Sequence, residues 1–195
     1  MFGGQGTKRS FFVSSFLLFM PVNIEIKARC PNPEHVRAVL EAAGARRVGL
    51  DRQIDTYFEV ERGRLKLRSG DIEKSLIYYE RPDGDAPKKS EVLLHRCADP
   101  ETLERVLRAV FKVKCVVDKR REIYYHGNVK LHVDDVESLG SFVEIEVIHD
   151  ADETSNRAID EDQMLAECNA WMARLGVNKD DLMRESYSDM IAARD

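Results

Sequence analysis

The chain has 195 residues, 43% of them hydrophobic and 33% charged, with a formal net charge of −5 at pH 7. This length suits one globular domain with its own core, and the acidic balance argues against a nucleic-acid binder. The four cysteines form no C-x-x-C pair, which argues against a zinc site or a disulfide framework and favours reduced thiols inside the cell.

The first 20 residues differ from the rest of the chain. Lys8 and Arg9 precede an apolar run over residues 11–20, and the first acidic residue is Glu25. The run is too short to cross a membrane, so we expect no membrane association. We interpret residues 1–20 as an N-terminal extension or as sequence upstream of a start at Met20, and residues 21–195 as the folded domain. A cytoplasmic protein is then expected, with a mitochondrial presequence as the alternative.

The first half of the domain alternates strands with helix signals. Residues 22–29 place polar and aliphatic side chains on opposite faces, as expected of a strand. Asn32-Pro33 is typical of a helix start, and Gly44 of its end. Asp99-Pro100 repeats the helix start. Between the two helices, strands are expected at 53–58, 64–68, 75–81 and 90–96.

The second half begins with a strand at 116–125 and a pair of strands within 129–146. After residue 150 the pattern becomes helical. One helix is expected to end at Gly176, with Trp171 anchoring it, and a last short helix is expected over residues 180–193. Many strands joined by hairpin turns predict an α+β fold, in which one antiparallel sheet curls on itself with helices outside.

The strand pair at 129–146 is the most informative segment. Alternation places Lys130, His132 and Asp134 on one face of the first strand, and Glu144 and Glu146 on one face of the second. A solvated face is the ordinary explanation for such charges. Inside a closed barrel, however, charges are tolerated only when paired or bound to a metal or ligand. Clustered carboxylates facing Arg and Lys would match a polyphosphate with a divalent cation.

The chain resembles the CYTH family, which joins class IV adenylyl cyclases with thiamine triphosphatases and inorganic triphosphatases. Residues 23–27 read N-I-E-I-K where the family has E-x-E-x-K, so that Asn23 replaces the first acid. Further matching segments follow in order at 55–58, 64–68, 76–83, 119–121, 134–140, 142–146 and 186–189.

The resemblance implies an eight-stranded antiparallel β-barrel, a triphosphate tunnel with flanking helices. It implies Mg²⁺ or Mn²⁺ as the cofactor, with metal ligands Glu25, Asp134, Glu144 and Glu146. The triphosphate-binding residues would be Lys27, Arg64, Lys66, Arg68, Arg81, Lys119, Arg121 and Lys130. The catalytic set would be Glu25, Lys27, Lys66, Arg68 and Arg121.

Residues 23–27, together with R-P-D at 81–83 and K-K-S-E at 88–91, look closest to the class IV cyclase branch. That branch converts ATP to cyclic AMP and pyrophosphate. Hydrolysis of thiamine triphosphate or inorganic tripolyphosphate is the first alternative. A non-catalytic polyphosphate- or nucleotide-binding module is the second, and Asn23 keeps it open. The expected partner is a small-molecule triphosphate; a homodimer is left open.

Two further side chains have two interpretations each. His132 could be a ligand or general base, although a single histidine is more often structural. Tyr187 could close the mouth of the tunnel, although docking of the C-terminal segment is the favoured interpretation.

Overall fold

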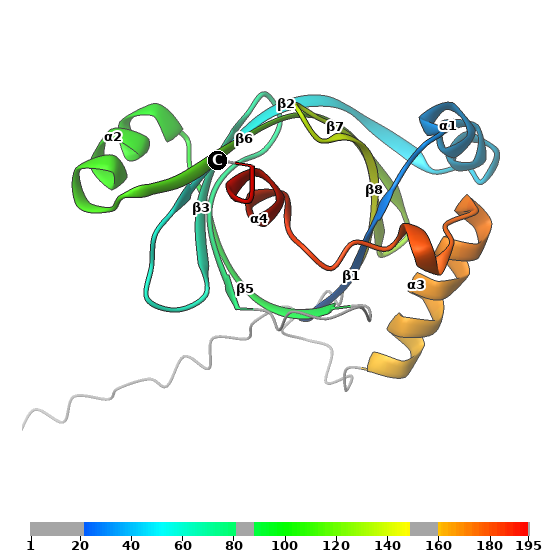
Figure 1. The fold of residues 1–195 in the computed structure, drawn as a ribbon. Coiled ribbons are helices and arrows are strands. Elements are labelled where there is room, and N and C mark those ends of the chain that lie inside the picture. The colour runs from blue at the N-terminus through cyan, green and yellow to red at the C-terminus, as the bar shows by residue number, and fades with distance from the viewer. Residues whose placement is uncertain (1–21, 81–87, 149–159, 195) are drawn as a thin grey trace, which may run out of the picture.

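The computed structural model describes residues 22–80, 88–148 and 160–194, and confirms the predicted α+β barrel. Eight strands close in the order β1-β5-β4-β3-β2-β6-β7-β8, and every neighbouring pair is antiparallel (Figure 1). The strands are β1 Val22–Arg29, β2 Arg46–Phe58, β3 Arg64–Gly70, β4 Lys74–Glu80, β5 Lys88–Arg96, β6 Val113–His126, β7 Val129–Val136 and β8 Gly140–Ile148.

The helices are α1 Pro33–Ala42, α2 Pro100–Val110, α3 Glu161–Leu175 and α4 Tyr187–Ala192, with a short 3₁₀ helix at Lys179–Asp181. The predicted caps are confirmed: the side chain of Asn32 accepts from the His35 amide, and that of Asp99 from the Thr102 amide. Gly176 ends α3 with φ 70°, a conformation that glycine adopts without strain. In the part of the chain that the structure describes, none of the helices has the length and apolar character needed to cross a bilayer.

The apolar core lies mainly outside the barrel wall. Side chains on the outward faces of β1, β7 and β8, such as Ile26, Leu131 and Ile145, pack under α1 and α3. Trp171 of α3 is buried there, with its ring edge-on to His126, so its predicted anchoring role is confirmed. Because alternate residues point to opposite faces of a strand, this packing turns the charged residues of the same strands into the barrel.

Two elements differ from the sequence-based expectation. Strand β2 begins at Arg46 instead of residue 53, because it pairs with β6 along nearly its whole length. The segment 180–193 is not one helix. Ser186 and Asp189 exchange side-chain and backbone hydrogen bonds in a capping box, which starts α4 only at Tyr187. As a result, α4 lies across one opening of the barrel (Figure 1).

Candidate active site

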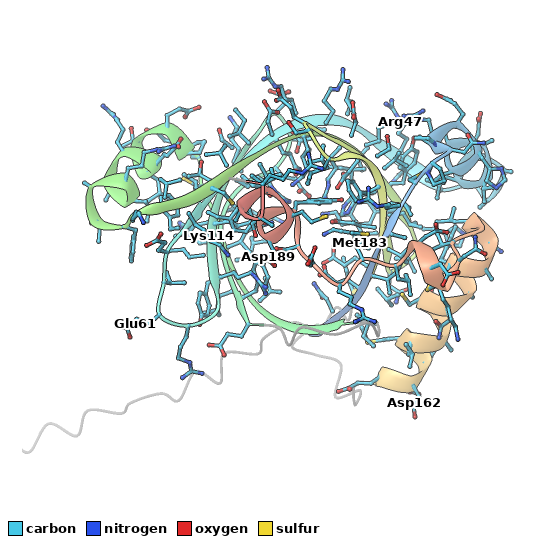
Figure 2. All side chains as sticks on the ribbon, viewed as in Figure 1. Arg47, Glu61, Lys114, Asp162, Met183 and Asp189 are labelled. Atoms are coloured by element: carbon cyan, nitrogen blue, oxygen red, sulfur yellow. The ribbon has the colours of Figure 1, made fainter. Side chains whose placement is uncertain are left out.

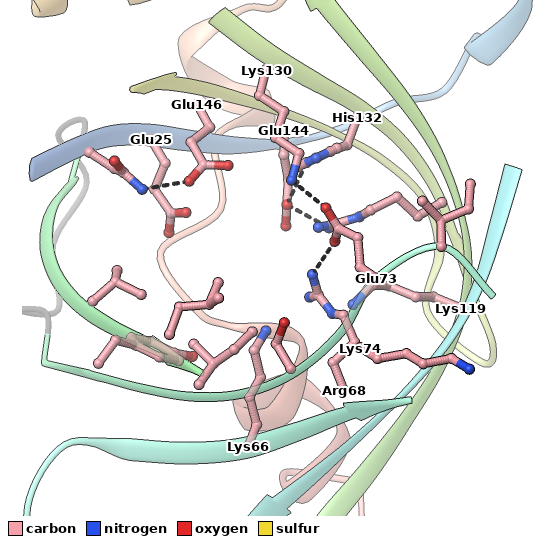
Figure 3. Close-up of a pocket in the computed structure, with 18 of the residues that line it drawn as sticks. Glu25, Lys66, Arg68, Glu73, Lys74, Lys119, Lys130, His132, Glu144 and Glu146 are labelled. Carbon is pink, nitrogen blue, oxygen red and sulfur yellow. Dashed lines mark hydrogen bonds and ion pairs between the residues drawn. The ribbon is translucent and has the colours of Figure 1, made fainter. Parts of the chain in front are cut away.

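The barrel encloses a cavity of about 630 Å³, a size typical of small-molecule sites. The inward faces of the strands line it (Figure 3). Nine of the residues implied by the resemblance lie on its wall: Glu25, Lys27, Lys66, Arg68, Lys119, Arg121, Lys130, Glu144 and Glu146.

Three other implied residues are placed differently. Asp134 is buried below the cavity wall, where Arg121 donates to both its oxygens (2.7 and 2.5 Å) and the Tyr187 hydroxyl donates at 2.8 Å. Its visible role is to position Arg121, and metal binding by Asp134 stays a prediction. Arg64 pairs with Asp189 of α4 at 3.0 Å, beside Lys114 at 3.2 Å from the same carboxylate (Figure 2). Arg81 lies outside the described residues.

The carboxylates meet where β1 pairs with β8. In this register Glu25 lies opposite Glu146, and Lys27 opposite Glu144. Like charges directly opposite each other destabilise a sheet unless a cation intervenes. Burial raises the pKa of Glu146; Lys130 opposes this shift, and the neighbouring Glu25 and Glu144 add to it. This pair of strands therefore favours an added positive charge.

The residues present fit a hard divalent cation. The Asn23 amide donates to Glu146 at 2.7 Å, while its buried Oδ1 finds no hydrogen-bond partner in the described part of the chain. Amide and carboxylate oxygens from Asn23, Glu25 and Glu146 are the ligands that Mg²⁺ and Mn²⁺ prefer. Over residues 22–80, 88–148 and 160–194, no three acidic, histidine or cysteine side chains are arranged so that they could hold a metal ion by themselves. Phosphate oxygens and water would therefore complete the coordination, as is usual for Mg²⁺.

A cluster of cations surrounds Asp55 on the opposite side of the cavity. Arg68 donates to both oxygens of Asp55 (2.8 and 2.9 Å), and the amines of Lys119 and Lys66 lie 2.8 and 3.1 Å from Oδ2. Burial alone would raise the pKa of Asp55, but Arg68, Lys119 and Lys66 outweigh it and hold the pKa well below its usual range. One carboxylate thus faces three cations, which leaves positive charge for a ligand.

Glu73 reaches into the cavity from the turn between β3 and β4. Its carboxylate accepts from Lys130 at 2.5 Å, Arg68 at 2.7 Å and Gln53 at 3.1 Å (Figure 3). A phosphate group would seek the same donors. Glu73 therefore competes with an incoming phosphate for Arg68 and Lys130.

His132 and Tyr187 complete the interior. His132 is 2% exposed, and its Nδ1 lies 3.3 Å from Glu144, while Nε2 has no partner among the described residues. Burial lowers the pKa of His132 to about 4, so the ring is neutral at neutral pH. Tyr187 not only docks the C-terminal segment but also lines the cavity, with the Lys27 amine 3.9 Å from its ring centroid.

The sequence profile of the CYTH domain matches residues 22–187, most of the chain. The chain belongs to the CYTH family. A protein of Methanocaldococcus jannaschii, provisionally named an adenylate cyclase, is 27% identical over 179 residues, covering 87% of this chain and 98% of that protein.

Solved structures of CYTH-like proteins share the fold. A Pyrococcus horikoshii protein superposes with a TM-score of 0.73 at 29% identity, covering 86% of this chain and 98% of the other. A Hippeastrum protein named as an adenylyl cyclase, whose structure was described with a dominant triphosphatase activity, gives a TM-score of 0.58 at 14% identity. The match covers 90% of this chain and 95% of that one.

Motif matching in this CYTH protein assigned no role to Asp55 or Glu73, and it did not place Asn23 among the metal ligands. Asp55 falls in a matching segment, and its alternation with Asp51 and Gln53 along β2 was a usable signal for an inward face. Glu73 carried no such signal, because it lies in a polar turn whose direction depends on the β3–β4 pairing.

Lys119 is expected to take up a proton when a polyphosphate binds. Burial, with Arg68, Arg121 and Lys66 nearby, lowers its pKa to about 7 although Asp55 opposes the shift. An added polyanion favours the charged amine and raises this pKa. The affinity for a polyphosphate should therefore fall as the pH rises above 7. Near pH ~8, binding should be accompanied by uptake of up to about one proton by Lys119.

Calorimetric titration of tripolyphosphate in two buffers with different ionisation enthalpies measures this uptake. Lys119→Arg should lose it, since arginine stays charged throughout. The ligand's own protonation is common to both proteins, so their difference isolates Lys119. Equal proton uptake by the two proteins would show that Lys119 is already charged.

Proposed function

We propose that this CYTH protein is a divalent-metal-dependent enzyme that converts ATP to cyclic AMP and pyrophosphate inside the barrel. The observation that supports it best is the division of the cavity wall. The carboxylates Glu25, Glu144 and Glu146 come from β1 and β8, where Lys27 lies among them, and most of the other Arg and Lys side chains of the wall come from β3, β6 and β7.

The cations suit a chain of phosphates. Arg68 and Arg121 are each fixed by a buried carboxylate, Asp55 and Asp134 respectively, so their planar forks are already oriented. Such preorganised donors stabilise charge that develops on phosphate oxygens during reaction, without reorganising at that moment. Lys27 and Lys130 add charge from the neighbouring strands.

In this proposal the side chains act by position and charge. When bound, Mg²⁺ or Mn²⁺ would neutralise and orient phosphate oxygens. Arg68, Lys119 and Lys66 hold the part of the triphosphate that leaves as pyrophosphate, and the barrel holds the ribose 3′-oxygen near the α-phosphorus. Glu25 and Glu146, with Asn23, hold the cation.

Hydrolysis of a triphosphate is the second candidate, because the side chains assigned here would bind phosphate or metal and none of them is assigned to select the attacking oxygen. Among the solved structures with this fold, one is provisionally named an adenylate cyclase, and another is named an adenylyl cyclase but described with a dominant triphosphatase activity. Binding without turnover is the third candidate, since Asn23 supplies one charge less than an acid would at that position.

Incubation of the purified protein with ATP, thiamine triphosphate and tripolyphosphate, each with Mg²⁺ or Mn²⁺, tests the proposal. Cyclic AMP and pyrophosphate from ATP are the expected products. Orthophosphate without cyclic AMP would replace the cyclase by a triphosphatase. Tight binding with no product under either metal would instead identify a binding module.

A further inference from the structure

One sector of the cavity wall differs chemically from the others. Strands β1, β3, β6, β7 and β8 each turn charged side chains into the cavity. Strands β4 and β5 add Lys74 and Arg96 to the lining, and further along these strands they contribute an apolar patch, formed by Ile77, Tyr79, Val92 and Leu94.

The register of β4 and β5 makes this patch continuous. Ile77 lies opposite Leu94, and Tyr79 opposite Val92, so that all four side chains share the inward face. Leu94 is 55% exposed although it lines the cavity. Large apolar side chains left open in a cavity are typical of ligand-binding walls.

The patch borders the phosphate-binding cations. Ile77 lies opposite Lys66, and Tyr79 opposite Arg64, in the pairing of β3 with β4. Around the closed barrel, the patch lies between the cations of β3 and the acidic strand β1, and half-way round from β6 and β7. A group attached to a triphosphate held by Lys66 and Arg68 would therefore reach the patch.

Inorganic tripolyphosphate has no apolar atoms to cover these side chains. We propose that the patch binds the organic part of the substrate, so that the site selects a nucleoside triphosphate over inorganic tripolyphosphate. A base ring would bury apolar surface against Leu94, Ile77 and Val92 and contact the ring of Tyr79. This inference rests on the proposed function, because it presupposes that a triphosphate occupies the cavity.

Adjacent leucines on β5 provide a matched test. Leu94 faces the cavity, whereas Leu93 follows the opposite alternation and is 39% exposed on the outer face. Each would be replaced by Ala in the full chain, and the affinities for ATP and tripolyphosphate measured by calorimetry with Mg²⁺. Since both side chains are partly exposed, neither change should impair folding, and thermal unfolding checks this.

Leu94→Ala is expected to weaken ATP binding about fivefold, because it removes the burial of about one to two methylene groups against the ligand. Tripolyphosphate binding should stay unchanged. Leu93→Ala should change neither. An unchanged ratio of the two affinities in Leu94→Ala would overturn the inference while leaving the triphosphate site standing. Failure of the unmutated protein to bind either ligand would overturn the proposed function itself.

Discussion

Replacing Glu146 by Gln is expected to reduce metal-dependent turnover at least about a hundredfold, because the amide removes one of the two charges that face each other across β1 and β8. The fold should survive, since burial already disfavours the charged form of this side chain and raises its pKa. Steady-state rates over a range of Mg²⁺ and Mn²⁺ concentrations measure the effect.

Glu144 is a less clean target than Glu146. It pairs with Lys27 at 2.7 Å and Arg121 at 2.5 Å, so its loss would leave buried cations without a partner and destabilise the protein. Asp135→Asn is the matched control, because this carboxylate lies on the outward face of β7 and pairs with Arg120 at the surface. If the Glu146 variant keeps the rate of the Asp135 variant at every metal concentration, the metal site is placed wrongly.

Asp55→Asn is expected to cost about 3–5 kcal/mol of the free energy of unfolding, because it leaves Arg68, Lys119 and Lys66 buried around a neutral amide. For a chain of this size the midpoint of thermal unfolding should fall by roughly 6–20 °C. Tripolyphosphate should restore part of the loss, since a ligand that binds only the folded state stabilises it.

Asp118→Asn provides the comparison for Asp55. Asp118 faces outward from β6 and pairs with Arg52 at 3.0 Å, and such an exposed pair contributes at most about 1 kcal/mol. Equal shifts of the unfolding midpoint in the two variants would contradict a central role for Asp55.

The strands and the division of each into a charged and an aliphatic face were predictable because both follow from local alternation. A strand with aliphatic residues on one face, such as 22–29, specifies which residues share a side. The sequence leaves open which side is the inside, and the family resemblance supplied that. Glu25, Glu144 and Glu146 therefore reached the cavity as predicted.

Other parts of the site depend on pairing between distant strands. Asp55 meets Arg68 because β2 and β3 pair in that register, and meets Lys119 through the neighbouring β6. Asp134 lies on the predicted face, yet Arg121 directly opposite it on β6 and Tyr187 from α4 engage its oxygens. No local pattern specifies these partners, since each comes from a separate segment of the chain.

Several predictions from the sequence stay as predictions. The homodimer, the cytoplasmic location and the domain boundary after residue 20 are among them. Residues 1–20 lie outside the described part of the chain, as does Arg81.

The central claim is that one cavity binds a triphosphate together with a divalent cation. Calorimetric titration of tripolyphosphate into the full chain, with and without Mg²⁺, tests it most directly. Binding of one ligand per chain, strengthened at least about tenfold by Mg²⁺, is the predicted result, because a cation held by Glu25 and Glu146 would also bind phosphate oxygens. Absence of binding, or an affinity that Mg²⁺ does not change, would contradict it.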